Sequence, residues 1–432
     1  MKQYHKPSLL VRVVNKALFS AWMKWPKTAY YHYFLRKKVI AAVSERKLPY
    51  HVVFFVLNAG MWKYESLLEA MMRDERFKPL VIPYSLPWHT REQQLLFQNE
   101  VVEYCRRKGY PCRVAFDIEN QQYVPAKDIK ADFISYSQPY NNCHHFWRLE
   151  RFWRRALVFN YPYGLPLESN VFNNLLIHNV AWKNFFPTDS LRALYDRNPI
   201  THGYNYVFSG NVVYDRMAAE QPDDCGVWKD GALHTRKRII WAPHHTIGDH
   251  DELPFSTFLT LCDAMVDLAR KYVREVEIAF KPHPMLRERL YTTWGKEKTE
   301  EYYTLWATMP NTRLALGDYI GLFKTSDAMI HDCSGFMLEY LYTRKPVLFV
   351  SKNNTEDYLS SYARSCFRHH YHAFSPSDVE TFIADTVIAG NDTMKPERDK
   401  FYMEELLPPH NNTAAVNMLN EFSSFVENTA AK

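Results

Sequence analysis

The chain has 432 residues, of which 47% are hydrophobic and 23% charged, so it can bury the cores of two domains and is not broadly disordered. Its 13 glycines are few, and it contains neither G-x-G-x-x-G nor G-x-x-x-x-G-K-[ST], which excludes the common glycine-rich phosphate loops. The formal net charge of +5 is too small to indicate nucleic-acid binding, so we expect no nucleic-acid partner. Seven cysteines without a C-x-x-C pair are typical of a reduced, cytoplasmic protein.

Residues 1–48 form a basic segment. Nine Lys and Arg residues, and no acidic ones, precede Ser44, and they interrupt the apolar and aromatic positions too often for a secretory signal or a membrane span. Basic amphipathic segments bind anionic membrane surfaces, each Lys or Arg contributing about 1 kcal/mol. We therefore expect a peripheral protein at the inner face of the cell membrane. The alternative is a helix that packs on the first domain with its basic side in solvent.

Strands and helices then alternate along the chain. The continuous apolar runs are typical of parallel strands buried on both faces. This pattern predicts an α/β fold class with two doubly wound, Rossmann-like domains joined by a linker, at residues 49–220 and 232–396, and a helical tail at 397–432 that we expect to cross back to the first domain. The predicted strands are 51–57, 80–82, 132–136, 157–160, 206–208, 238–242, 276–280, 328–331 and 346–350, and the predicted helices include 91–108, a segment through Trp147 and Trp153, 258–268 and 336–342.

Ligands of open parallel sheets bind beyond the carboxyl ends of the strands. Three predicted strand ends in the second half carry polar loops: P-H-H-T with His244 and His245, K-P-H-P with Lys281 and His283, and H-D-C-S-G from residue 331. We expect the three loops to open on one crevice. His244 and His245 would bind phosphate or act as acid and base. A divalent metal there, helped by the D-x-D string at 249–251, is an alternative that we do not adopt, and we expect no metal.

The third loop precedes a predicted helix. Unpaired N–H groups at a helix that begins at Ser334 or Gly335 attract phosphate, and Gly335 lets it approach the backbone. Glu339, one turn later, could accept hydrogen bonds from ribose hydroxyls. The alternative is an ordinary serine N-cap followed by a surface glutamate. His283, fixed between two prolines, would stabilise charge on a leaving diphosphate with a protonated ring, and Lys281 either joins it or points into solvent.

The K-P-H-P string, the H-D-C-S-G-F-M-L-E-Y string at 331–340 and the K-P-V-L-F-V that follows resemble the nucleotide-binding half of the CDP-glycerol glycerophosphotransferase family. These are teichoic-acid and capsule polymerases with a GT-B fold, and the resemblance spans about 238–350. It implies two Rossmann-like domains that face each other across a cleft. It implies that His283 contacts the cytidine diphosphate, Ser334 and Gly335 the phosphates, and Glu339 the ribose. A nucleotide-activated, CDP-linked donor would be the substrate, with no cofactor.

One family element, W-H-G-T-P-L-K with its histidine base, is missing, and Tyr163 stands near that histidine's place. Replacement bases are His178 and His202, and the other catalytic candidates are His244, as acid or base, and His283, as stabiliser of the leaving group. Residues after two strands of the first half would contact the acceptor, or else belong to the core. These acceptor candidates are Asn58, Gly60, Lys63, Gln138 and Tyr163.

The predicted function is transfer of a CDP-glycerol-type group to a hydroxyl of a glycan or lipid-linked acceptor in cell-surface polymer synthesis. A GT-B glycosyltransferase that uses a nucleotide sugar is the main alternative. A non-hydrolysing nucleotide-sugar epimerase shares the fold, and a non-catalytic scaffold or nucleic-acid binder that uses the basic N-terminus remains open.

Overall fold

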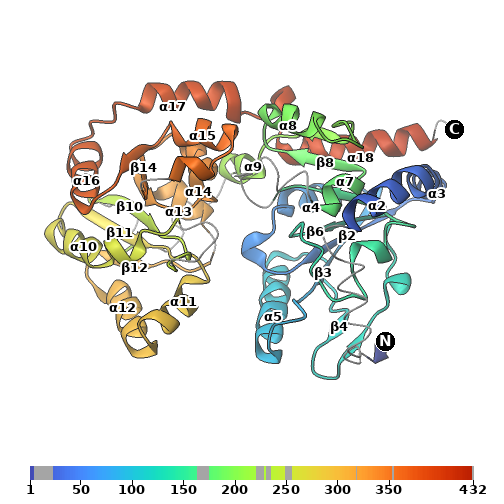
Figure 1. The fold of residues 1–432 in the computed structure, drawn as a ribbon, viewed down its shortest axis with the longest axis horizontal. Helices are drawn as coiled ribbons and strands as arrows, with labels where there is room; N and C mark the ends of the chain where they lie inside the picture. Colours follow the sequence, from blue (N-terminus) through green and yellow to red (C-terminus); the bar gives the residue numbers. More distant parts are fainter. Residues whose placement is uncertain are drawn as a thin grey trace. The chain divides into compact units, whose positions relative to one another are not determined.

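A computed structural model describes residues 1–3, 23–162, 175–219, 228–229, 235–248, 255–317, 319–352 and 355–430. The chain folds into two compact units, each built on its own sheet with helices packed against it (Figure 1). Unit 1 comprises Met1–Tyr163, Ser169–Asp215 and Pro408–Lys432, and unit 2 comprises Gly164–Glu168 and Arg216–Leu407. The last residues of the chain therefore belong to unit 1.

The sheet of unit 1 has six parallel strands in the order β3-β2-β6-β7-β8-β9. Successive side chains of the central strand β2 enter two different cores, Phe54 on one face and Phe55 on the other, because a strand alternates its side chains. The strands predicted for this half all form within a few residues of their expected bounds. The strands are β2 (Tyr50–Val56), β3 (Phe77–Pro83), β6 (Phe133–Tyr136), β7 (Leu157–Asn160), β8 (Lys183–Phe186) and β9 (Tyr206–Phe208).

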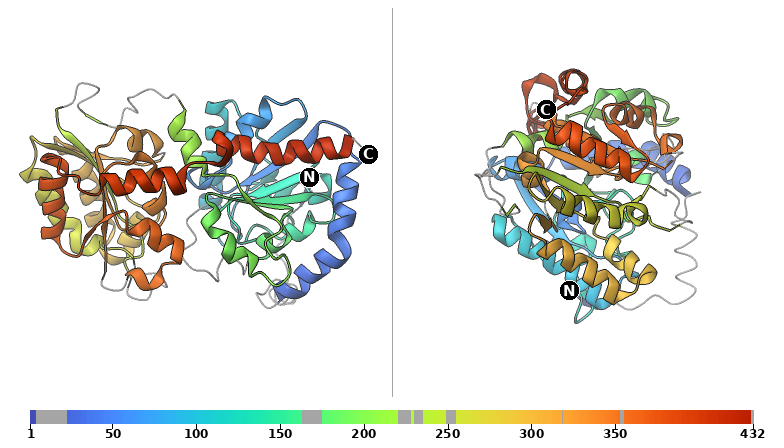
Figure 2. Two further views of the ribbon diagram at one scale, coloured as in Figure 1. Left: turned by 90° about the horizontal axis from the view of Figure 1, so that it is seen from above. Right: turned by 90° about the vertical axis from the view of Figure 1, so that its left-hand side faces the viewer.

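Helix α18 (Ala414–Ala430) covers one face of this sheet (Figure 2). Met418, Phe422 and Val426 recur every four residues and enter the same core as Phe54. Asp215 accepts hydrogen bonds from the N–H groups of the first two residues of α18, at 2.7 and 2.8 Å. Other helices described in this half are α2 (Lys24–Tyr30), α3 (Arg36–Ser44), α4 (Glu65–Met72), α5 (Arg91–Lys108), α7 (Leu176–Val180), α8 (Arg192–Asp196) and α9 (Val212–Ala218).

The helix predicted through Trp147 and Trp153 is wrong. Only one 3-10 turn, η5 (Leu149–Arg151), forms there. The Trp147 indole N–H donates to the Val124 carbonyl at 2.9 Å, and the Leu149 N–H donates to Asn141 Oδ1 at 2.9 Å. These contacts to other segments hold the chain in a compact loop. A small antiparallel sheet in the order β1-β5-β4 was also not predicted; its strands are β1 (Lys2–Gln3), β5 (Gln122–Tyr123) and β4 (Phe116–Asp117).

The sheet of unit 2 is also six-stranded and parallel, in the order β12-β11-β10-β13-β14-β15. Trp241 of β10 and Phe280 of β11 are paired in register and stack on each other at a centroid distance of 4.9 Å. The predicted helix 336–342 is split into α14 and the 3-10 turn η7 (Tyr340–Thr343). The strands are β10 (Lys237–Ala242), β11 (Val276–Phe280), β12 (Thr312–Leu314), β13 (Ala328–His331), β14 (Val347–Val350) and β15 (Tyr371–Ala373), and the helices are α10 (Phe258–Lys271), α11 (Leu286–Thr293), α12 (Lys296–Thr308), α13 (Ile320–Thr325), α14 (Phe336–Glu339), α15 (Ser361–Phe367), α16 (Pro376–Thr381) and α17 (Lys395–Phe401).

Candidate functional site

Three polar loops follow three neighbouring strands of unit 2. Strands β11, β10 and β13 lie side by side and parallel, so their loops leave the same edge of the sheet. Backbone pairing continues past the strand ends. The Lys281 N–H donates to the Trp241 carbonyl at 2.8 Å, and the His283 N–H donates to the Pro243 carbonyl at 3.0 Å. The first two loops are therefore fixed against each other by the sheet itself.

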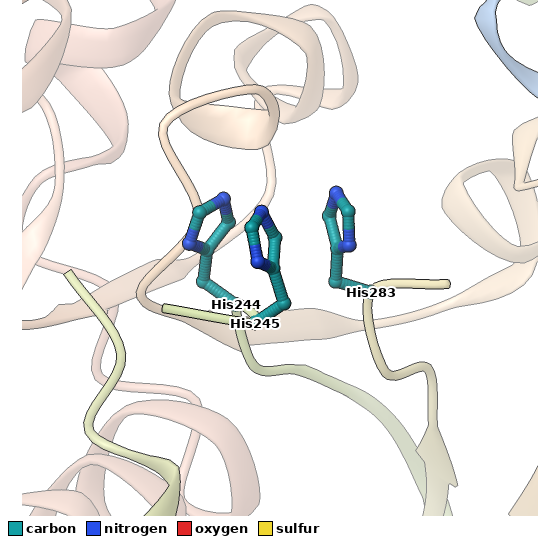
Figure 3. Close-up of side chains that lie close together, drawn as sticks. All are labelled: His244, His245 and His283. Atoms are coloured by element: carbon teal, nitrogen blue, oxygen red, sulfur yellow. The ribbon is translucent and has the colours of Figure 1, made fainter. Parts of the chain in front are cut away.

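Three imidazoles lie together at this edge. Figure 3 shows the side chains of His244, His245 and His283 next to one another. The ring centroid of His245 is 4.3 Å from that of His244 and 4.2 Å from that of His283. One nitrogen of each ring lies within 4.8 Å of the others, and over the described ranges no other group of His, Cys, Asp or Glu is close enough to hold a metal ion. A ligand at this edge, whether anion or cation, would meet several imidazoles.

The hydrogen bonding of His283 suits an anion. The Met285 N–H donates to His283 Nδ1 at 3.1 Å, so the neutral ring carries its proton on Nε2. Burial, followed by the charges of His245, His244 and Lys281, lowers the pKa of His283 to about 2. At pH 7 the ring is neutral and offers an N–H donor at Nε2. A metal ion at Nε2 would need the proton on Nδ1, where it would oppose the Met285 N–H.

His244 is held through both its backbone and its ring. Its N–H donates to Asp332 Oδ1 at 2.6 Å, and its carbonyl accepts from Ser256 Oγ at 2.8 Å. Its Nδ1 lies 2.8 Å from Thr246 Oγ1, which also accepts the Phe255 N–H at 3.2 Å. The Thr246 N–H also lies 3.4 Å from Nδ1 and donates to it in the tautomer that carries its proton on Nε2. In the other tautomer Nδ1 carries the proton and donates to the closer hydroxyl, and the lone pair of the neutral ring is on Nε2. His244 then has the form that a general base requires.

Asp332 connects the third loop to the first, a role that the sequence did not predict. It is 2% exposed and accepts three hydrogen bonds, from the His244 N–H, the Thr257 N–H at 2.5 Å and the Thr257 hydroxyl at 2.9 Å. Burial raises the pKa of Asp332 to about 6, and these hydrogen bonds oppose the rise. Its carboxylate therefore ties the His244 loop to the start of α10. The H-D-C-S-G string contains this aspartate, but its partners lie 75 and 88 residues away.

The loop of Ser334 and Gly335 leads into a helix that is only four residues long. Gly335 has φ −62°, a conformation open to any residue, so its backbone does not require glycine. Burial raises the pKa of Cys333 to about 12, while hydrogen bonds from the N–H groups of Gly335 and Phe336 oppose the rise. The charge of Glu339, which is 8% exposed, adds to the rise. The N–H groups at this helix start therefore face the Cys333 thiol, with the Glu339 carboxylate nearby.

Lys281 has a partner inside unit 2. Its ammonium group donates to the Gly317 carbonyl at 2.7 Å, and the residue is 8% exposed. The side chain thus ties the end of β11 to the loop after β12. Its expected contact with the donor stays a prediction.

Four of the five acceptor candidates, those other than Tyr163, follow the neighbouring strands β2 and β6. Asn58 Oδ1 accepts the Gly60 N–H at 2.8 Å, and a Cβ on Gly60 would lie only 3.1 Å from that oxygen, so this tight turn favours glycine. Lys63 is half-buried in the same loop. Gln138 is buried and accepts a hydrogen bond from Asn142 Nδ2 at 3.2 Å. Tyr163 lies outside the described residues, as does the D-x-D string at 249–251.

His178 lies in the short helix α7 and is 3% exposed. Its ring packs edge-on against Tyr195, and its carbonyl accepts hydrogen bonds from Asn184 at 2.7 Å and Asn205 at 3.2 Å. A general base must come within hydrogen-bond reach of the acceptor hydroxyl. The burial of His178 therefore favours a structural role, whereas His202 is exposed in a turn.

Comparison with known proteins gives a family match and several fold matches. Residues 213–401 match the model of the CDP-glycerol:poly(glycerophosphate) glycerophosphotransferase family. A search of curated protein sequences finds no match. Among the described residues, no helix combines the length and apolar character needed to cross a bilayer.

The fold resembles several solved structures. One is the wall teichoic acid polymerase TagF soaked with CDPG, at 11% identity and a TM-score of 0.58, with 95% of this chain and 98% of that chain covered. Another is S. aureus MnaA with UDP, at 13% identity and a TM-score of 0.55, covering 88% and 97%. The UDP-GlcNAc 2-epimerase of Methanocaldococcus jannaschii matches at 11% identity and a TM-score of 0.53, covering 87% and 99%. The expected resemblance to the CDP-glycerol glycerophosphotransferase family is thus confirmed over residues 213–401, and the chain is an enzyme of the transferase class with a GT-B fold.

Proposed function

We propose that this enzyme transfers a glycerophosphoryl group from CDP-glycerol, or a closely related CDP-linked donor, to a hydroxyl of a teichoic-acid-like or capsule polymer. The observation that carries the proposal is the imidazole cluster of His244, His245 and His283, which lies inside the segment that matches the family. A neutral His283 with its proton on Nε2 is suited to a diphosphate oxygen, and we propose that His245, Ser334 and Gly335 bind the phosphates with it.

In the proposed reaction, the acceptor hydroxyl oxygen attacks the β-phosphorus of the donor. A new P–O bond forms, the bond from that phosphorus to the bridging oxygen breaks, and CMP leaves with the bridging oxygen and its negative charge. The hydroxyl proton passes to His244 Nε2, since His244 is half-buried at the sheet edge whereas His178 is buried. His283 stabilises the charge on the departing phosphate. No metal or cofactor takes part in this proposal.

The remaining contacts are assigned by the same reasoning. Glu339 would accept hydrogen bonds from the ribose hydroxyls, because its carboxylate is near the start of α14. Lys281 would hold the donor-binding loop of His283 in place through its hydrogen bond to the Gly317 carbonyl. On the acceptor side we propose the residues that follow strands β2 and β6 and the tyrosine near the missing family histidine, namely Asn58, Gly60, Lys63, Gln138 and Tyr163.

We also propose that the basic N-terminal region associates with the inner membrane surface. The run from α2 to α3 packs on unit 1 through Tyr31, which is 1% exposed, but Tyr33 and Phe34 are 82% and 61% exposed. Exposed aromatic rings beside Arg36, Lys37 and Lys38 suit an anionic interface. Replacing Tyr33 and Phe34 by serine should weaken binding to phosphatidylglycerol vesicles, and unchanged binding would contradict this part of the proposal.

A nucleotide-sugar transferase is the second candidate, because proteins solved with UDP share the fold. Thermal unfolding with CDP-glycerol, CDP-ribitol, UDP-sugars, GDP-sugars and CMP-sugars separates the two. A ligand at 100 times its Kd stabilises the folded state by about 2.7 kcal/mol, so CDP-glycerol should raise Tm by roughly 5 °C. A rise with a UDP-sugar and none with CDP-glycerol would overturn the proposal. Interconversion of a free nucleotide sugar without an acceptor would identify an epimerase instead.

A further inference from the structure

Unit 1 contains a pocket of about 590 Å³ at the edge of its sheet where the strands begin. His51 lies at the start of β2, Asp132 directly precedes β6, and Arg155 comes two residues before β7. Asn58 and Gln138 follow the opposite ends of β2 and β6. The pocket is therefore separated from the proposed acceptor residues by the length of the strands.

The lining of this pocket is strongly basic. It contains five Lys and Arg side chains and two Asp side chains, a formal charge of +3 with His51 neutral. The whole chain carries only +5, so this one pocket concentrates a large part of the excess positive charge. The charged residues of the lining are Arg46, Lys47, Lys127, Asp128, Lys130, Asp132 and Arg155.

Two arginines are built into the pocket wall. Arg46 donates to the Asp132 carboxylate and to the carbonyls of Ala131 at 3.0 Å and Arg155 at 2.7 Å. Arg155 donates to the Ile129 carbonyl at 3.1 Å. Burial, followed by the charge of Arg46, lowers the pKa of Arg155, and the charges of Asp128 and Asp132 oppose this shift. Asp132 is also occupied by the His51 N–H at 2.6 Å.

Three exposed lysines also line this pocket. Lys47, Lys127 and Lys130 are exposed, and they form no ion pair with any residue that the structure describes. Asp128 is exposed as well and is the one acid of the lining that is not bonded to Arg46. The flexible side chains of these lysines, next to the hydrogen-bonded Arg46 and Arg155, can adjust to anions of different shapes.

We propose that this pocket is a second anion site that binds a phosphate group, separate from the donor site of unit 2. A phosphate carries one or two negative charges, which would balance one to two thirds of the +3 of the lining. A volume of about 590 Å³ is within the usual range for small-ligand sites, so it holds a glycerol phosphate moiety as well as inorganic phosphate. The same chemistry is offered by the headgroup of an anionic lipid and by a soluble phosphate ester. The proposal does not depend on the donor specificity proposed above.

The test compares two triple variants of the full chain. The pocket variant removes three positive charges from the lining and carries Lys47→Gln, Lys127→Gln and Lys130→Gln. The control variant removes three positive charges from exposed positions elsewhere and carries Lys78→Gln, Lys296→Gln and Lys400→Gln. The probes are inorganic phosphate and glycerol 3-phosphate, measured by titration calorimetry, and phosphatidylcholine vesicles with and without phosphatidylglycerol, measured by co-sedimentation. Thermal unfolding confirms that both variants fold, and Lys130→Gln alone serves if the pocket variant does not.

The proposal predicts that the pocket variant binds a probe about 100-fold more weakly than the unmodified chain, and that the control variant stays within a few-fold of it. Weaker binding of the soluble probes to the pocket variant identifies a general phosphate site. Weaker binding of phosphatidylglycerol vesicles alone, with Tyr33→Ser and Phe34→Ser present in every protein compared, identifies a lipid headgroup. Neither variant changes the unit 2 loops, so phosphate that binds there contributes equally to both and does not alter the difference in affinity between them. The proposal is overturned if the unmodified chain binds no probe. It is also overturned if the pocket variant binds the probes as tightly as the unmodified chain, or if the pocket and control variants lose equal affinity.

Discussion

Asp332 accepts the backbone N–H of His244 at 2.6 Å, and this bond joins two strand-end loops that the sequence separates by 88 residues. The same carboxylate accepts two hydrogen bonds from Thr257 at the start of α10. The position of the His244 imidazole therefore depends on a group that does not itself belong to the imidazole cluster. Asp332 is a positioning residue in this arrangement.

Replacement of Asp332 by Asn should lower kcat by at least 10-fold, because an amide cannot accept all three hydrogen bonds and His244 would shift. The matched control is Thr257→Val, which removes only the hydroxyl bond of 2.9 Å. This control should cost about 1 kcal/mol of stability and leave kcat within a few-fold. Steady-state kinetics and chemical unfolding of both variants check the prediction, and equal kcat values at equal loss of stability would contradict it.

Donor binding should take up no proton at His283 near pH 7. Burial, followed by the charges of His245, His244 and Lys281, lowers the pKa of His283 to about 2, so the ring is neutral before the donor arrives. The Met285 N–H donates to Nδ1 and opposes a second proton there, so the neutral ring donates from Nε2 to the bound diphosphate. Calorimetric titrations in buffers of different ionisation enthalpy measure the proton count. The count should be the same in the unmodified enzyme and in His283→Gln, and an uptake that disappears in His283→Gln would contradict the neutral donor form of His283.

Removal of divalent metal should leave turnover unchanged. The reason is the Met285 N–H, which occupies His283 Nδ1 and keeps the proton of the neutral ring on Nε2. Dialysis against EDTA, followed by metal analysis and activity assays, tests this expectation. Loss of activity that Zn²⁺ or Mn²⁺ restores would show that His244, His245 and His283 act as metal ligands.

Asp215 should make the stability of the protein fall as the pH rises. Burial raises the pKa of Asp215 to about 6, although the N–H groups of Ala415 and Ala414 oppose this rise. Since the folded-state pKa is above that of the unfolded chain, the contribution of this group is full below about pH 4 and is lost as the pH passes through 6. The loss amounts to about 2 to 3 kcal/mol.

The control for this effect is Asp215→Asn, which cannot ionise. Urea unfolding measures the free energy of unfolding of the unmodified chain and of Asp215→Asn, and the difference between them should change by about 2 to 3 kcal/mol from pH 4 to pH 7. A difference that is constant with pH would contradict the assigned role of Asp215.

Local signals predicted much of the fold. Helix α5 has its predicted bounds because Thr90 and Gln93 form a capping box and Gly109 ends the helix at φ 70°. The strands ahead of the three unit 2 loops were also predicted, since their apolar runs are continuous. Adjacency of His244 and His283 followed from the general rule for parallel sheets.

The long-range contacts could not be predicted from the sequence. The loop at Trp147 has apolar spacing that suggests a helix, but the Val124 carbonyl and Asn141 hold it in another form. The carboxylates of Asp332 and Asp215 gain their roles from N–H groups far along the chain, which no local pattern indicates. The basic pocket of unit 1 likewise gathers residues from three separate segments.

Calorimetric titration of CDP-glycerol into the unmodified enzyme and into His283→Ala tests the central claim most directly. The account predicts saturable binding to the unmodified enzyme, at least 10-fold weaker binding to the variant, and a loss of about 100-fold or more in its turnover. His283→Gln, which keeps an N–H donor, should recover part of the affinity. Equal affinity and turnover in His283→Ala would contradict the placement of the donor diphosphate at this histidine.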